Sequence, residues 1–139
     1  MDFLARREYG QTELIRKLAD KGYERDAAAQ AVVQLTEEGL QSDERFAESF
    51  VQSRINQGKG PVRIRLELKE RGIAPGVTDD ALTRARQDWY QLARAVRVRK
   101  FGRKLPGEFK EKARQMRFLQ YRGFEQEQIR SAVQSHGDD

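Results

Sequence analysis

The sequence predicts an all-α protein made of three tandem three-helix repeats in an elongated, curved array. Three glycines, Gly22, Gly72 and Gly123, lie 50 and 51 residues apart; each follows a basic residue, precedes an apolar one and has a leucine four positions before it. Glycine after a helix-forming run ends the helix because it enters the left-handed region at little cost. A helical unit that occurs three times in tandem is typical of repeat proteins. The alternative explanation of the pattern is chance similarity among helices that end at glycine.

Composition agrees with this fold class. Apolar residues make up 37% of the 139 residues and charged residues 35%, so one thick core is not expected. A thin array, in which each repeat covers the apolar face of its neighbour, suits such a chain better than a sphere. We place the three repeats at residues 1–41, 42–86 and 87–139, the last including a polar tail.

The first repeat is predicted to contain three helices. A short helix over Asp2–Arg7 ends at Tyr9–Gly10, and a second begins near Thr12, whose hydroxyl suits an N-cap. A third covers about residues 25–38. Apolar residues at helical spacing predict the buried faces of the second and third helices, namely Leu14, Ile15, Leu18, Ala28, Ala31, Val32 and Leu35.

The second repeat opens with a cap at Ser42–Asp43, and Phe46, Phe50 and Val51 form the buried stripe of a helix that reaches about Asn56. Gly58 and Gly60 break this helix, and Pro61 starts the next one, because proline suits a first helical position. Residues 62–69 alternate apolar and polar, which is a strand signal. We predict a helix there, because its residues are helix formers and its ends are correctly placed. Thr78 is the predicted cap of the third helix, with Asp79 and Asp80 in its first turn.

The third repeat begins in a stretch with neither glycine nor proline from residue 77 to 101, so one long helix is possible there. Asp88 and Gln91 fit the residue types of a capping box, and they favour a boundary near residues 85–88. We then expect helices over about 88–101, ended by Gly102, and over about 108–122 and 126–135. The helix over 108–122 is predicted to bury Phe109, Ala113, Met116 and Leu119.

Residues suited to catalysis are scarce. The chain has no cysteine, and its one histidine, His136, lies in the tail. Zinc chemistry and Ser-His or Cys-His nucleophiles therefore cannot be assembled, and we predict no catalytic, cofactor or metal site. No apolar run approaches the roughly 18 residues of a membrane span, and no signal-peptide core follows the start. We expect a soluble, cytoplasmic, monomeric protein that is not an enzyme.

Positive charge is concentrated in the middle of the chain, although the net charge is only +5. Residues 59–71 hold five basic and two acidic side chains, and residues 84–104 hold eight basic side chains and one acidic. For residues 84–104 such a concentration favours an acidic or polyanionic partner over a solvated helix face, whereas for residues 59–71 the two interpretations are equally open. The predicted partner-binding residues are Lys59, Arg63, Arg65, Lys69, Arg86, Tyr90, Arg94, Arg97, Arg99, Lys100 and Phe101.

Five of these residues follow helical spacing and predict one exposed face, in steps of four, four, three and four: Arg86, Tyr90, Arg94, Arg97 and Phe101. The opposite stripe of Trp89, Leu92, Ala93 and Val96 is the expected core face. In the alternative, Tyr90 and Phe101 pack against a neighbouring repeat while the arginines lie in water.

Several segments together resemble the RecX family of recombination regulators. They are Arg45-Phe46-Ala47-x-x-Phe50-Val51-x-x-Arg54, Gly58-Lys59-Gly60-Pro61-x-Arg63-Ile64-x-x-Glu67-Leu68-x-x-Arg71-Gly72-Ile73, Asp88-Trp89-x-x-Leu92-Ala93-Arg94, Arg99-Lys100-Phe101-Gly102 and Arg117-Phe118-Leu119-x-Tyr121-Arg122-Gly123-Phe124. The similarity covers nearly the whole chain. The start at Asp2–Arg7 departs from the family, because relatives often carry an extra leader.

The resemblance implies tandem three-helix repeats, no enzymatic activity, and binding to the RecA recombinase filament. It further implies inhibition of the ATPase, strand-exchange and co-protease activities of that filament, either by capping its growth or by blocking its groove. Two other functions stay open: a helical module that binds single- or double-stranded DNA directly, and a structural adaptor without a DNA role.

Overall fold

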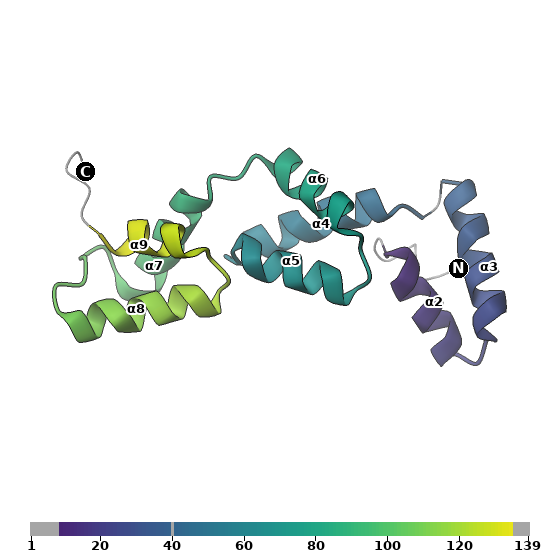
Figure 1. Ribbon diagram of the computed structural model, residues 1–139, viewed down its shortest axis with the longest axis horizontal. Helices are drawn as coiled ribbons and strands as arrows, with labels where there is room; N and C mark the ends of the chain where they lie inside the picture. Colours follow the sequence, from purple (N-terminus) through teal and green to yellow (C-terminus); the bar gives the residue numbers. More distant parts are fainter. Residues whose placement is uncertain (1–8, 40, 135–139) are drawn as a thin grey trace. The chain divides into compact units, whose positions relative to one another are not determined.

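The computed structural model describes residues 9–39 and 41–134, and within them the chain forms eight helices and no strand (Figure 1). The helices are α2 (Gln11–Asp20), α3 (Arg25–Glu37), α4 (Asp43–Asn56), α5 (Pro61–Glu70), α6 (Pro75–Ala85), α7 (Trp89–Phe101), α8 (Phe109–Tyr121) and α9 (Gln126–Val133). The all-α prediction is confirmed, including a helix over the alternating segment 62–69. The predicted helix over Asp2–Arg7 and the tail with His136 lie outside the described residues.

The three repeated glycines end their helices in the same way. Gly22, Gly72 and Gly123 have φ values of 99°, 80° and 94°, all in the left-handed region. In each case the backbone N–H of the following residue donates to the carbonyl of the leucine four positions before the glycine, at 3.1 Å, 3.1 Å and 3.2 Å. This bond satisfies a carbonyl that the helix itself leaves without a partner. The repeated helix end predicted from the sequence is confirmed.

Two helices, rather than one, cover residues 77–101. Helix α6 ends at Ala85 and α7 begins at Trp89, and the backbone N–H of Gln91 donates to Asp88 Oδ1 at 3.1 Å. The chain turns between the helices at Arg86, which has a φ of 49°. The predicted boundary and its N-cap are confirmed.

Two predicted helix starts are wrong. Helix α2 begins at Gln11 instead of being capped by Thr12, and the N–H of Gln11 donates to Asp43 Oδ1 at 2.7 Å, so a distant side chain supplies the cap. Helix α6 begins at Pro75, because proline suits a first helical position. Thr78 therefore lies inside that helix, 4% exposed.

The described residues fall into two compact units, and each has its own packing. Of the described residues, the first unit comprises 9–39, 41–52 and 67–85, and the second comprises 53–66 and 86–134. In the first unit α2 packs on α3 around a core of Tyr9, Leu14, Leu18, Ala28 and Val32. In the second unit α7 and α8 pack on α9 around Ala93, Leu119, Phe124, Ile129, Ala132 and Val133. The boundaries of the three sequence repeats stay a prediction.

Helix α8 shows one further error in the predicted core. Phe109, its first residue, is 85% exposed instead of buried, whereas Leu119 is fully buried as predicted. The polar Gln115 is buried, one residue before Met116, which packs at the edge of the core. No helix in residues 9–39 or 41–134 has the length and hydropathy needed to cross a bilayer.

Candidate binding groove

A groove of about 430 Å³ lies within the second unit, between the end of α4 and the helices α7 and α8. Three stretches line it: residues Ile55, Asn56 and Gly58; residues Leu92, Ala95, Val96, Arg99 and Lys100; and residues Phe118 and Arg122. Helical spacing explains the contributions of α7 and α8, because residues three and four apart share one face. The groove therefore follows one stripe of α7 and one of α8.

Apolar side chains form the walls of this groove. Ile55 is buried, and Leu92, Val96 and Phe118 are partly buried at the edge of the core. The ring of Phe101 packs edge-on against Phe118, with centroids 5.3 Å apart and an interplanar angle of 88°. The groove is thus an opening onto the apolar core of the unit.

Cations surround these walls. Lys100 Nζ lies 5.6 Å from the centroid of the Phe118 ring, and the Arg122 guanidinium lies 6.0 Å from the same centroid. The Arg122 Nη2 group also donates to the carbonyl of Gln57, which holds the guanidinium at the groove. Arg99 is the third cation, and none of the described residues that line the groove is acidic. The local potential is therefore positive.

The turn between α4 and α5 is held against the end of α8 by backbone hydrogen bonds. The N–H of Gly60 donates to the carbonyl of Arg122, and the N–H of Val62 donates to that of Gly123, both at 2.9 Å. A Cβ on Gly60 would come 2.6 Å from the backbone nitrogen of Phe124, so only glycine permits this approach. The Gly-Pro turn therefore connects the α4–α5 segment to the end of α8 and fixes one wall of the groove.

The structure brings only two of the predicted partner-binding residues into this groove, Arg99 and Lys100. The predicted residues from segment 59–71 lie elsewhere. Lys59 is in the turn, Arg63 lies 5.6 Å from the centroid of the Tyr121 ring, and Arg65 and Lys69 are exposed on α5. Arg86 precedes α7 and is exposed, and Arg94 is partly buried.

The two predicted aromatic contacts have partners within the chain. Tyr90 is 40% exposed, and its hydroxyl donates to Glu127 Oε2 at 3.3 Å. Partial burial, together with the negative charge of Glu127, raises the pKa of the Tyr90 hydroxyl. Phe101 is partly buried against Phe118, and the Arg114 guanidinium lies 5.0 Å from the centroid of the Phe101 ring.

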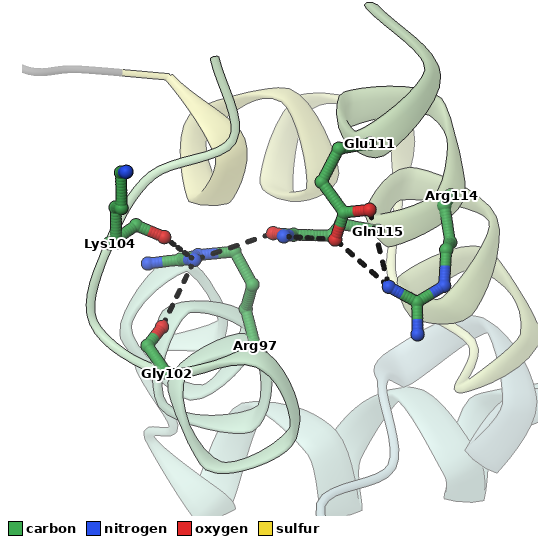
Figure 2. Close-up of polar contacts among 6 residues, drawn as sticks. All are labelled: Arg97, Gly102, Lys104, Glu111, Arg114 and Gln115. Carbon is green, nitrogen blue, oxygen red and sulfur yellow. Dashed lines mark hydrogen bonds and ion pairs between the residues drawn. The ribbon is translucent and has the colours of Figure 1, made fainter. Parts of the chain in front are cut away.

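Arg97 corrects the prediction of one exposed face. It is only 3% exposed, and Figure 2 shows its guanidinium directed into the loop that follows α7. Its Nη1 group donates to the carbonyls of Gly102 at 3.4 Å and Lys104 at 3.3 Å, and to Gln115 Oε1 at 3.4 Å. Burial lowers the pKa of this guanidinium. Arg97 stabilises the loop, because α7 turns this position toward α8 rather than toward solvent.

Sequence reasoning missed Arg122 and the apolar walls of the groove. The sequence marks Arg122 as the basic residue before a repeated glycine and as part of a family segment, but not as a groove residue. The equivalent Arg71 has a different environment, 4.7 Å from the centroid of the Phe50 ring. Ile55 and Val96 carry no sequence signal that separates a groove wall from an ordinary core residue. No group of three or more His, Cys, Asp or Glu side chains suited to a metal occurs among the residues that the structure describes.

Comparisons with known proteins place the chain among regulatory proteins. Family models described as the second, third and first three-helix domains of RecX match residues 42–82, 87–133 and 1–35. A protein named regulatory protein RecX from Halorhodospira halophila is 47% identical over 98% of this chain and 84% of its own length. The protein of the same name from Pseudomonas fluorescens is 44% identical over the whole chain and 90% of its own length.

Solved structures show the same fold. A crystal structure of regulatory protein RecX aligns with a TM-score of 0.79 at 24% identity, over 94% of this chain and 66% of that one. A crystal structure of RecX from Lactobacillus salivarius aligns with a TM-score of 0.78 at 21% identity, over 95% of this chain and 88% of that one.

Proposed function

The chain belongs to the RecX family of regulatory proteins, and we propose that it binds the RecA recombinase filament and inhibits its ATPase, strand-exchange and co-protease activities. Its role is then to modulate recombinational DNA repair, acting as a cytoplasmic monomer through binding rather than catalysis. The observation that supports this function best is the groove of the second unit, with its apolar walls and three cations. Apolar area combined with complementary charge is what specific protein partners use.

The test compares two double charge reversals that change the net charge equally, and a third is added below for the second candidate function. Arg99→Glu/Lys100→Glu alters the groove, and Arg16→Glu/Arg25→Glu alters exposed positions of the first unit as a control. We expect the groove variant to need at least about tenfold more protein for half-inhibition of the recombinase ATPase, which corresponds to about 1.4 kcal/mol. The control should stay within about twofold of the parent, and both melting curves should change little, because exposed charges contribute little to stability.

The solvent face of α8 favours a second candidate function, direct binding of nucleic acid. Phe109 and Tyr121, 85% and 73% exposed, lie at the two ends of α8, and Lys110 and Arg117 are exposed between them. Exposed aromatic rings beside cations suit stacked bases and phosphates.

The third double reversal, Lys110→Glu/Arg117→Glu, separates the two functions. If it alone abolishes inhibition and also weakens binding to a labelled DNA oligonucleotide, the chain acts through nucleic acid and the groove proposal is wrong. If only the groove variant loses inhibition, contact with the recombinase is supported.

A further inference from the structure

We infer that the groove of the second unit receives an acidic peptide segment in which one bulky apolar side chain is flanked by carboxylates. This inference rests on the proposed function, because it names the chemistry of the partner at the same groove. Three features of the lining carry it: the apolar walls, the position of the cations relative to those walls, and two positions that keep the groove open.

The walls call for an apolar side chain. Leu92 and Val96 of α7 lie one turn apart on one side, and Phe118 of α8 belongs to the same groove and packs against the same core. A groove of about 430 Å³ with such walls is large enough to accept a leucine, phenylalanine or tryptophan side chain. Covering these walls with an apolar group removes them from water, which is favourable.

The cations favour carboxylates next to that apolar group. Lys100 comes from α7 and Arg122 from the end of α8, and both lie within 6.0 Å of the Phe118 ring centroid. A side chain that enters beside Phe118 therefore lies near both positive charges. Because no carboxylate occurs among the described lining residues, an acidic ligand meets attraction without repulsion inside the groove.

The same lining disfavours a nucleic acid as the occupant. Single strands bind through aromatic rings whose faces are open to the bases. Phe118 is the one aromatic residue among the described lining residues; two cations already lie near its ring, and Phe101 packs against it. The remaining walls are aliphatic, so they fit a protein side chain better than a stacked base.

Small residues keep the groove open at two positions. A Cβ at Gly58 would come 3.0 Å from Val96 Cγ2 and 3.0 Å from Arg122 Nη2, so any side chain there would occupy the groove. Ala95 lines the groove and is exposed, so a larger residue at that position fills the space without entering the core. Ala95→Trp is therefore a blocking variant, and Ala27→Trp, at an exposed position of α3, is its matched control.

The experiment measures fluorescence anisotropy of a labelled peptide in which one phenylalanine lies between two pairs of acidic residues. One matched peptide has alanine in place of phenylalanine, and another has glutamine in place of the acidic residues. We expect the parent protein and Ala27→Trp to bind the first peptide. Each peptide change removes either the apolar or the acidic part of the ligand, and Ala95→Trp fills the groove. Each of these changes should therefore weaken binding at least about tenfold.

Several outcomes would overturn the inference. They are equal binding of the alanine peptide, undiminished binding by a folded Ala95→Trp variant, or a labelled oligothymidylate that displaces the acidic peptide from the groove. Recombinase ATPase assays on the same variants distinguish the two proposals. If the parent inhibits the recombinase and Ala95→Trp inhibits equally well, the groove inference fails while the proposed function stands. If the peptide binds in the groove but the parent does not inhibit, the proposed function fails while the groove chemistry is supported.

Discussion

The ends of α2 and α8 have the same local structure but different surroundings. Gly22 and Gly123 share the left-handed backbone and the same hydrogen bond back to a leucine. A Cβ on Gly22 would meet no atom within 4 Å, whereas a Cβ on Gly123 would come 2.7 Å from the backbone nitrogen of Arg63 in α5. The first glycine is needed only for its conformation, and the second is needed for its lack of a side chain as well.

Gly72, at the end of α5, lies between these extremes. A Cβ there would come 2.7 Å from Thr12 Oγ1 and 2.8 Å from Thr12 Cβ, so it would meet a side chain rather than backbone. A side chain can adjust at a lower cost than a hydrogen-bonded backbone can. The comparison therefore predicts a graded response to the same substitution at three equivalent positions.

Gly123→Ala should have the largest effect. Left-handed strain costs about 1–2 kcal/mol for a residue with a Cβ, and overpacking adds about 1–3 kcal/mol. We expect the free energy of unfolding, measured by urea denaturation, to fall by about 2–5 kcal/mol. The variant should also bind the acidic peptide more weakly, because the hydrogen-bonded contact between the start of α5 and the end of α8 supports one wall of the groove. A loss no greater than that of Gly22→Ala would show that the close approach of α5 to α8 contributes nothing.

Gly72→Ala should have an intermediate effect, about 1–3 kcal/mol by the same denaturation. A double-mutant cycle with Thr12→Ala sharpens this prediction, because that change removes two of the three nearest atoms. The cost of Gly72→Ala should then be smaller in the Thr12→Ala background, by roughly 0.5–1 kcal/mol. Full additivity of the two changes would contradict the contact between these positions.

Gly22→Ala should have the smallest effect, about 1 kcal/mol, from backbone strain alone. The expected readout is a modest shift of the urea midpoint with an unchanged slope, and unaltered peptide binding. A loss as large as that of Gly123→Ala would mean that the surroundings of the three glycines do not decide their importance.

Helix boundaries were predictable where a single local signal specifies them. The glycine stops and the Asp88 cap depend on hydrogen bonds between residues at most six positions apart, and all of them are confirmed. The start of α2 was not predictable, because its cap comes from Asp43, 32 residues away. The start of α6 illustrates competing local signals, since Pro75 at the first position takes precedence over a threonine cap at Thr78.

The candidate site was predictable only in part. The excess of positive charge directed attention to Arg99 and Lys100, which do line the groove. Helical spacing instead placed Arg97 on the predicted exposed face, although Arg97 is buried and donates to loop carbonyls. Helical periodicity defines which residues share a face, but it does not define which face a neighbouring helix covers.

The sequence by itself determined the class of fold and the way its helices end. The reason is that the glycine and the hydrogen bond that end each helix involve residues only a few positions apart. The family could also be recognised from its motifs alone. Only the tertiary structure decided that Arg97 stabilises a loop, that Gly123 lies against Arg63, and that Arg122 and Lys100 both lie near the ring of Phe118. The physical reason is that burial and the partners of a charge depend on segments far apart in the chain, which no local pattern specifies.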